Sequence, residues 1–377
     1  MSNERASLVV AVSLFLVTLA VNLEAPLYPK YAEQAGVGGG ITSLVFALYT
    51  VSLMFILTFF GGASDRIGRK RIIVLGLGAS WLATVLMIAF PSMNALMIAR
   101  LLQGAGVAFS VATSTAYLVE LNPTRTDRVA MVVGMMTSFG FGAGALLTSL
   151  ALGLGSTLVP ISFWGVAMVT TACLVATFRL PEQAGNGESA WVRLPYYNGL
   201  VVKMGFLLAM AWAVTGLIIA VLPLQLNKYG LAQWAGVVLF TVNGVGALVQ
   251  PIARRVDPLT SLRVGFIVVP LGYSVLVFGA WTGVLGLIIV GAAIAGMGCY
   301  GLSYYGSLSQ VTRYSPAEHR ARATSGFLMI AYVGFSLPSV LIGYLSESIG
   351  IIPALVFFGA LIVLTSLFGA LRVKAPA

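Results

Sequence analysis

Two ionisable side chains, Glu24 and Arg100, lie within long apolar segments of this 377-residue sequence. The other acids and the single histidine, His319, fall in polar loops or at the ends of apolar segments. The protonation of a carboxylate responds to desolvation and to a nearby guanidinium, so a Glu24 that faces Arg100 could bind and release a proton. Two other interpretations stay open: a static ion pair, or a Glu24 that lies at a polar boundary.

The second candidate is GGASDRIGRKR, residues 61–71, called the charged segment below. Only 8% of the residues in the chain are charged, yet Asp65, Arg66, Arg69, Lys70 and Arg71 fall together here. Basic residues in a short loop can simply fix the topology of a membrane protein. A role in topology does not explain why Asp65 and the glycines of this segment are present.

Polar and aromatic side chains with helical spacing form a third group. Tyr28 follows Glu24 at i+4, and Gln103 follows Arg100 at i+3, so each pair shares a helix face. Packing or interfacial anchoring is the alternative for each aromatic residue. Together they predict an aromatic, weakly polar cavity lined by Tyr28, Gln103, Trp212, Asn243, Tyr300, Tyr304 and Tyr332.

The elements that position these residues are predicted from composition. Hydrophobic residues make up 59% of the chain and its mean hydropathy is +0.98, which is typical of an integral membrane protein. Blocks of about 20 apolar residues suffice for an α-helix to cross the hydrocarbon core. The sequence predicts twelve such helices, at about 7–33, 42–62, 72–91, 94–119, 129–152, 159–179, 201–225, 233–253, 264–281, 284–311, 323–345 and 351–370.

The twelve segments fall into two sets of six. A polar stretch, 181–200, predicts a cytoplasmic linker between an N-terminal six-helix bundle (1–180) and a C-terminal one (201–377). The sequence PLYPKY at 26–31 ends the first segment, and the similar PLQLNKY at 223–229 ends the seventh. These matches fall at equivalent topological positions and favour a duplicated six-helix unit with pseudo-symmetry.

The net charge of +10 is explained by topology. With both termini in the cytoplasm, every Lys and Arg except Lys30, Lys228 and Arg100 falls on the cytoplasmic side. This asymmetry follows the positive-inside rule, so no nucleic-acid partner is predicted. The first apolar stretch is long and lacks a clear cleavage site, so it is interpreted as an uncleaved first span.

The charged segment, read as G-x-x-x-D-R-x-G-R-K between the second and third spans, resembles the signature of the major facilitator superfamily. The matching residues are Gly61, Asp65, Arg66, Gly68, Arg69 and Lys70. An R-x-x-Q-G pattern in the fourth span (Arg100, Gln103, Gly104) adds to the resemblance, which covers the whole chain. The proline that exporters of this family carry in a glycine-rich fifth span is missing here, which leaves the direction of transport open.

The resemblance implies that helices 1, 4, 7 and 10 line a central cavity. It also implies that Asp65 lies against the start of the eleventh helix near Ala323, and that Arg69 reaches Glu120. A carboxylate at a helix N-terminus and a charge-assisted pair would then hold a cytoplasmic gate shut. The predicted gate residues are Gly61, Asp65, Arg66, Gly68, Arg69 and Glu120.

We therefore expect a secondary transporter with alternating access that exports small organic compounds in exchange for protons, with Glu24 and Arg100 as coupling residues. The alternatives are proton-coupled uptake of a sugar, organic acid or metal chelate, and an uncoupled membrane sensor or lipid scramblase. An enzyme is not expected, since no cluster of catalytic or metal-binding side chains is present. The expected partners are a small-molecule substrate, protons and the lipid bilayer, for a monomer without cofactor in a prokaryotic cell membrane.

Overall fold

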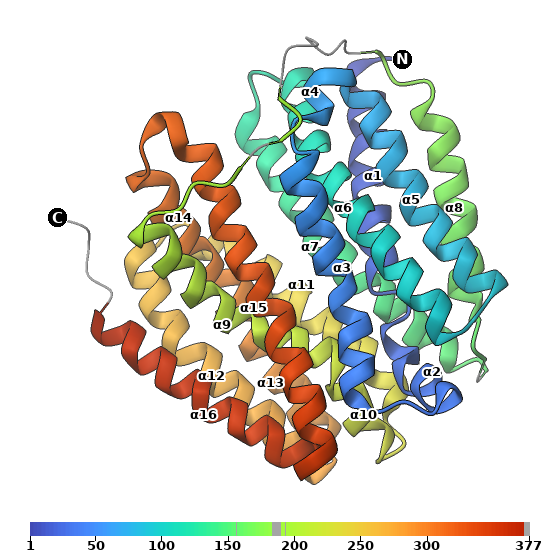
Figure 1. Ribbon diagram of the computed structural model, residues 1–377. Helices are drawn as coiled ribbons and strands as arrows, with labels where there is room; N and C mark the ends of the chain where they lie inside the picture. The colour runs from blue at the N-terminus through green and yellow to red at the C-terminus, as the bar shows by residue number, and fades with distance from the viewer. Residues whose placement is uncertain (156, 183–189, 193, 373–377) are drawn as a thin grey trace. The chain divides into compact units, whose positions relative to one another are not determined.

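The structure is a computed structural model that describes residues 1–155, 157–182, 190–192 and 194–372. The described residues form helices joined by turns and short loops, and contain no strand (Figure 1). The predicted linker 181–200 lies partly outside the described residues. This all-helical architecture confirms the fold class predicted from composition.

Contacts divide the chain into two compact units, each described by itself. Unit 1 comprises Met1–Ala35 and Leu48–Arg193. Its helices are α1 (Asn3–Val21), η1 (Ala25–Leu27), α2 (Tyr28–Ala35), the later part of α3 (Gly39–Phe59), α4 (Ala63–Ile67), α5 (Arg69–Ala89), α6 (Met93–Leu121), α7 (Thr126–Leu152) and α8 (Ile161–Thr177). Close packing of α1 on α7 depends on Gly144, because a Cβ there would overlap the carbonyl oxygen of Leu19.

Unit 2 comprises Gly36–Ala47 and Leu194–Ala377. Its helices are α9 (Gly199–Ala220), α10 (Leu222–Asn227), η2 (Ala232–Trp234), α11 (Ala235–Ala253), α12 (Pro258–Thr282), α13 (Leu285–Gly296), the π-helix η3 (Met297–Ser303), α14 (Tyr304–Tyr314), η4 (Ala317–His319), α15 (Arg320–Ile349) and α16 (Ile351–Arg372). The beginning of α3 belongs to this unit, where the Gly40 amide donates to Glu347 Oε1 of α15 over 2.8 Å.

Side-chain caps define several helix starts. Ser92 accepts a hydrogen bond from the Ala95 amide before α6, and Asn198 accepts one from the Val201 amide before α9. Asp257 accepts hydrogen bonds from the amides of Leu259 and Thr260 before α12. Pro258 is the first residue of α12, where its missing amide hydrogen costs no hydrogen bond of the helix. These caps satisfy amides that would otherwise lack a partner.

By length and apolar composition, eleven helices among the described residues can cross a membrane. The twelfth apolar helix, α8, has 17 residues and therefore spans about 26 Å. The predicted segments are thus present, with shifted ends: the predicted 94–119 is Met93–Leu121, and the predicted 323–345 is Arg320–Ile349. The cytoplasmic location of both termini stays a prediction.

Three predicted continuous helices are interrupted. The first segment changes from α1 to a 3-10 turn at Ala25–Leu27 before continuing as α2, and the seventh breaks between α9 and α10 at Val221. Each break lies just before the proline of the repeated PL motif, Pro26 or Pro223, so the two halves share a local structure as well as a sequence. The tenth segment contains a seven-residue π-helix.

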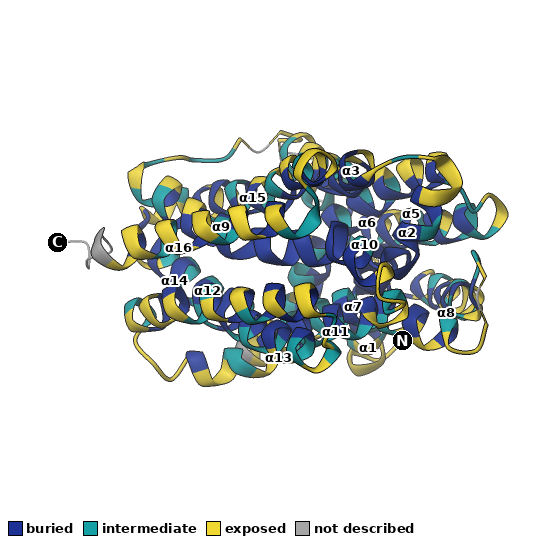
Figure 2. Cartoon of the chain, turned by 90° about the horizontal axis from the view of Figure 1, so that it is seen from below, coloured by how far each residue is buried: buried dark blue, intermediate teal, exposed yellow. Residues whose placement is uncertain are grey.

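Exposed apolar side chains cover the outer faces of the helices. Helices such as α12 and α16 alternate between buried and exposed residues around their circumference (Figure 2). Leu271 and Trp281 of α12 are 53% and 60% exposed, and Phe368 of α16 is 59% exposed. Such faces are stable in contact with lipid, which agrees with a membrane protein.

Candidate functional site

Glu24 lies at the break in the first span. It precedes the 3-10 turn Ala25–Leu27, where the Leu27 amide bonds to the Glu24 carbonyl over 2.8 Å. Pro26 has no amide hydrogen, so the regular α-helical ladder is interrupted here. The Glu24 side chain is nonetheless fully buried. The chain therefore holds a carboxyl group in the protein interior at a point where the backbone departs from the α-helix.

The polar side chains around Glu24 form one buried network. Gln103 Nε2 donates to Glu24 Oε1 over 2.9 Å and to the Ala20 carbonyl over 3.0 Å. Arg100 Nη1 donates to Gln103 Oε1 over 3.0 Å and also to the Val21 carbonyl. Glu24, Arg100 and Gln103 have no exposed surface. Gln103 thus connects Glu24 and Arg100, the two charged side chains that the sequence places away from the ends of the predicted spans.

An aromatic ring packs against the other side of Arg100. The guanidinium carbon of Arg100 lies 5.1 Å from the centre of the Tyr49 ring, a cation–π distance. A Cβ at Gly104 would overlap the Tyr49 carbonyl oxygen, so the glycine of the R-x-x-Q-G pattern lets α6 approach α3. Sequence reasoning missed Tyr49, because nothing in its spacing distinguishes it from other aromatic residues in spans.

The buried polar atoms that have no hydrogen-bond partner among the described residues include Glu24 Oε2 and the hydroxyl of Tyr28. Leaving such groups unpaired costs free energy, so they require an explanation. A proton on Glu24 Oε2, or a polar group of a bound substrate, would provide one. The predicted common helix face of Glu24 and Tyr28 is wrong, because the helix breaks between the two residues. Tyr31 of α2 donates to the Leu158 carbonyl over 3.0 Å.

The aromatic residues predicted in the second half gather around Trp212 of α9. The centre of its indole lies 5.7 Å from the Tyr300 ring, 5.8 Å from the Tyr304 ring and 5.4 Å from the Tyr332 ring. We call these four residues the aromatic cluster. Asn243 is also buried, and its side-chain amide donates to the Leu239 carbonyl of its own helix over 3.0 Å.

The predicted gate residues of unit 1 lie at the junction of α4 and α5. Arg69 forms an ion pair with Glu120 at the end of α6, and its Nη1 lies 3.6 Å from Asp65 Oδ1. Gly68 joins the two helices with φ of 99°, a conformation that favours glycine. The guanidinium of Arg66 lies 5.2 Å from the Trp191 ring. The expected contact of Asp65 with the start of α15 stays a prediction.

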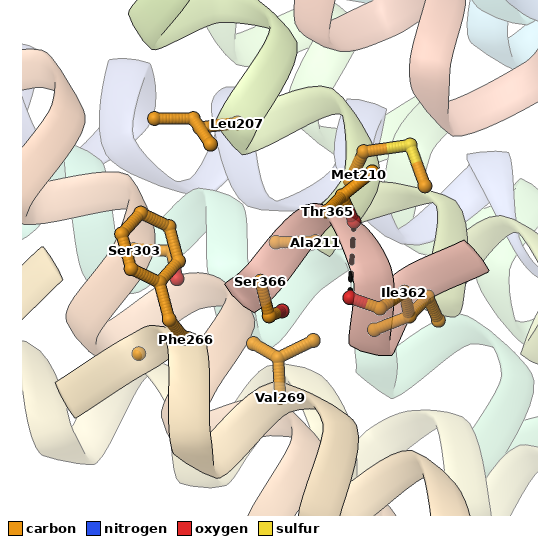
Figure 3. Close-up of a pocket in the computed structure, with 10 residues that line it drawn as sticks. Leu207, Met210, Ala211, Phe266, Val269, Ser303, Ile362, Thr365 and Ser366 are labelled. Carbon is orange, nitrogen blue, oxygen red and sulfur yellow. Dashed lines mark hydrogen bonds between the residues drawn. The ribbon is translucent and has the colours of Figure 1, made fainter. Parts of the chain in front are cut away.

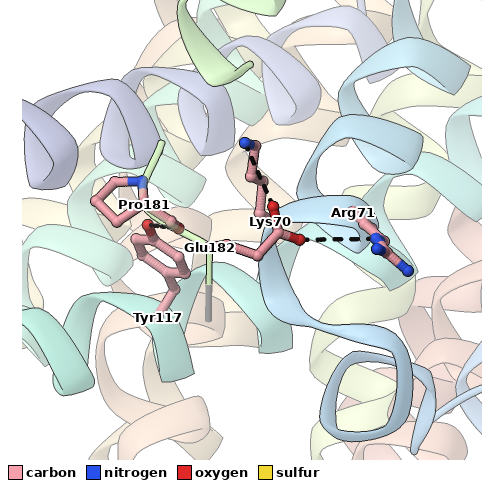
Figure 4. Close-up of polar contacts among 5 residues, drawn as sticks. All are labelled: Lys70, Arg71, Tyr117, Pro181 and Glu182. Atoms are coloured by element: carbon pink, nitrogen blue, oxygen red, sulfur yellow. Dashed lines mark hydrogen bonds and ion pairs between the residues drawn. The ribbon is translucent and has the colours of Figure 1, made fainter. Parts of the chain in front are cut away.

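The charged segment also holds the end of the sixth span, which sequence reasoning missed. Lys70 Nζ and Arg71 Nε each lie 3.6 Å from a carboxylate oxygen of Glu182. Next to this contact, the buried Tyr117 donates to the Pro181 carbonyl over 2.8 Å (Figure 4). The basic residues after Gly68 therefore bind the chain where it leaves α8, in addition to any effect on topology.

A family model described as Major Facilitator Superfamily matches residues 10–337. This chain belongs to the major facilitator superfamily. It is accordingly a multi-pass membrane transporter of the cell membrane, as predicted, and its relatives are transporters rather than enzymes. The proton-coupling, cavity and gate roles of individual residues stay predictions.

Bacterial efflux and resistance proteins are among the similar curated proteins. The Multidrug efflux protein YfmO of Bacillus subtilis is 25% identical over 371 residues, which is 92% of this chain and 88% of YfmO. The Methylenomycin A resistance protein of Streptomyces coelicolor is 29% identical over 38% of this chain and 32% of its own length. The Quinolone resistance protein NorA of Staphylococcus aureus is 26% identical over 30% of this chain and 29% of NorA.

Solved structures support the fold. The nucleoside transporter NupG superposes with a TM-score of 0.77 at 13% identity, over 98% of this chain and all of NupG. Its D323A mutant gives a TM-score of 0.79 at 12% identity with the same coverage. At this level of identity the likeness concerns the fold alone.

Proposed function

We propose that this superfamily member exports small organic compounds in exchange for protons, as a monomer in the lipid bilayer. The observation that carries the proposal is the buried Glu24, whose one carboxylate oxygen is bonded to Gln103 and whose other oxygen is unpartnered. A carboxyl group in this position can take up a proton without losing its existing hydrogen bond. The sequence places every other acid in a polar loop or at the end of a predicted span.

Protonation of Glu24 changes the balance of the network. An ionised Glu24 offsets the positive charge of Arg100, and Gln103 connects the two. Glu24 Oε2, which has no partner among the described residues, can take up either a proton or a hydrogen bond from a donor group of the substrate. Proton binding and substrate binding would therefore compete for this oxygen, which is what exchange transport requires.

The names of similar proteins support the direction. YfmO is an efflux protein that aligns with nearly the whole chain, and the methylenomycin and quinolone relatives are resistance proteins. Resistance by transport requires movement of the compound out of the cell. We extend this to the present chain as export of organic compounds.

The charged segment would act as the cytoplasmic gate. Arg69 contacts both Glu120 and Asp65, and Gly68 supplies the bend between α4 and α5. We propose that this arrangement, with Gly61 and Arg66, stabilises the closed cytoplasmic side. Each charged contact at such partly exposed positions is worth about 1 kcal/mol or less.

Two alternatives remain testable. The same carboxyl group would serve proton-coupled uptake of a sugar, organic acid or metal chelate, since coupling does not fix direction. A membrane sensor or lipid scramblase with this fold would need no coupling. Uptake predicts that substrate moves in the same direction as protons, and the uncoupled class predicts a flux that does not depend on the proton gradient.

The test uses purified protein in liposomes with a fluorescent aromatic dye on both sides. Acidification of the outside should drive the dye out of the vesicles if protons and dye move in opposite directions. Accumulation of the dye inside under the same gradient would show symport and overturn export. Flux that is independent of the gradient would favour the uncoupled class.

A further inference from the structure

The aromatic cluster contains an indole N–H without a hydrogen-bond partner. Trp212 is 8% exposed, and its Nε1 has no partner among the described residues. We propose that the cluster binds a flat, uncharged aromatic part of the substrate and that Trp212 Nε1 donates a hydrogen bond to an acceptor on it. This inference rests on the proposed function and specifies the class of compound exported.

Aromatic stacking is the first feature that selects this class. The Tyr304 ring stacks on the indole at an interplanar angle of 25°, and the Tyr332 ring meets it at 62°. Trp212 comes from α9, Tyr304 from α14 and Tyr332 from α15, so three helices present aromatic faces and edges to one volume. A planar ring can replace any of these contacts with an equivalent one, which makes stacking tolerant of substrate shape.

Tyr300 of the π-helix η3 and Tyr304, the first residue of α14, both contact the indole of Trp212. The hydrogen bonds of a π-helix join residues i and i+5, so its turn is wider than that of an α-helix. Cys299 Sγ donates to the Ala211 carbonyl of α9 over 3.0 Å, which fixes η3 beside the residue that precedes Trp212. π-Helical turns are frequent at functional sites.

A nearby cavity does not provide the site. It lies among α9, α12, η3 and α16 and is lined by Ala211, Phe266, Ser303, Ile362 and Thr365, among others (Figure 3). Its volume of about 10 Å³ holds at most about one water molecule. We therefore expect a substrate ring to bind against the half-buried tyrosine rings around Trp212 and not to fill this cavity.

The unpartnered N–H indicates an acceptor on the substrate. An indole nitrogen only donates, and a buried donor without a partner raises the free energy of the protein until a partner arrives. The Ser307 hydroxyl, one helical turn after Tyr304, is also buried without a partner among the described residues. A ring nitrogen, carbonyl or ether on the substrate would satisfy the indole, whereas a hydrocarbon ring would not.

Charge argues against a cationic ring at this position. The described acids of unit 2 are Asp257, Glu318 and Glu347, all exposed and located at helix ends. A cationic ring would depend on cation–π attraction to the aromatic rings alone, without help from a carboxylate, and burying a charge without a counter-charge costs free energy. The cluster therefore favours an uncharged ring.

Three fragments of one shape test the inference on the purified full chain. Naphthalene has no acceptor, isoquinoline has a ring nitrogen and is uncharged at slightly alkaline pH, and N-methylisoquinolinium carries a fixed positive charge. Ligand-observed NMR titrations, corrected for partition into protein-free micelles, give a Kd for each. Wild type should bind isoquinoline about fivefold more tightly than naphthalene, the effect of one hydrogen bond, and the cation most weakly.

Substitution assigns the preference to the indole N–H. Trp212→Phe keeps an aromatic ring and removes the donor, so the ratio between isoquinoline and naphthalene should fall to about one. Trp281→Phe, on the exposed face of α12, should leave the ratio unchanged. Equal binding of the two neutral fragments to wild type, or tightest binding of the cation, would overturn the inference without use of any variant.

The outcome is independent of the coupling experiment. A wild-type preference that is lost in Trp212→Phe, combined with absent proton-driven flux, would retain the ligand class and reject the proposed function. Proton-driven flux without any preference among the fragments would do the reverse.

Discussion

Gln103 donates a hydrogen bond from Nε2 to Glu24 Oε1 over 2.9 Å, and so connects the break in the first span to α6. The same side chain accepts from Arg100 over 3.0 Å. Two groups of opposite charge are thereby linked through a neutral amide that can bond to both at once. We propose that loss or gain of a proton on Glu24 affects Arg100 through this residue.

Replacement of Gln103 should destabilise the protein as well as impair transport. Gln103→Leu has a similar volume but removes the bonds to Glu24, Arg100 and the Ala20 carbonyl. Buried groups without partners cost about 1–3 kcal/mol, so the thermal unfolding temperature in detergent should fall by several degrees. Gln34→Leu, at an exposed position of α2, is the matched control and should unfold like wild type. Equal unfolding temperatures for both variants would refute the network's structural importance.

Two glycine substitutions should have opposite effects. Gly104→Ala places a methyl group onto the Tyr49 carbonyl oxygen and should cost about 1–3 kcal/mol through overpacking. Gly78→Ala, in the middle of α5 with nothing within 4 Å of its Cβ, should stabilise the chain by about 0.5–1 kcal/mol. Thermal unfolding in one detergent measures both. A stabilising Gly104→Ala would show that α6 and α3 are not in close contact.

The ion pair between Arg69 and Glu120 should contribute little by itself. Glu120 is 38% exposed, so solvent screens the pair. A double-mutant cycle with Arg69→Gln and Glu120→Gln should give a coupling free energy of about 0.5–1 kcal/mol in unfolding experiments. A coupling of zero would leave the gate without its proposed contact.

Asp65→Asn should increase the share of molecules that are open to the cytoplasm. The substitution removes the charge that the proposed gate places at a helix N-terminus. Maleimide labelling of a cysteine introduced at the buried Gln310 measures the opening; the native Cys173 and Cys299 are both buried. Glu33→Gln, an exposed acid on α2, serves as the control. Labelling that is the same in all three proteins would count against a gate at Asp65.

Hydropathy predicted the membrane class and the approximate helices because each span needs a long apolar stretch and most connecting segments contain polar residues, glycine or proline. It did not predict the breaks at Ala25–Leu27 and Val221 or the π-helix at Met297–Ser303, since the average hydropathy stays high through all three; Pro26 and Pro223 are the local signals for the two breaks. Those irregularities decide where Glu24 and Tyr300 lie. Hydropathy alone therefore finds the scaffold and misses the local geometry of the candidate sites.

Helical spacing placed Gln103 on the face of Arg100, but the bond between Gln103 and Glu24 joins residues far apart in the sequence. The contacts of Tyr49 with Arg100 and of Glu182 with Lys70 and Arg71 are equally non-local. Spacing within one helix carries no information on which helix lies opposite. These partners could be found only from the three-dimensional arrangement.

Proton-driven transport by Glu24→Gln tests the central proposal most directly. Glutamine keeps the size of the side chain and its ability to accept from Gln103, but it cannot take up or release a proton. In liposomes, exchange of labelled for unlabelled substrate without a pH gradient should continue at a rate within a fewfold of wild type, whereas accumulation driven by an imposed pH gradient should disappear. Accumulation at the wild-type level in Glu24→Gln would contradict the assignment of Glu24 as the coupling residue.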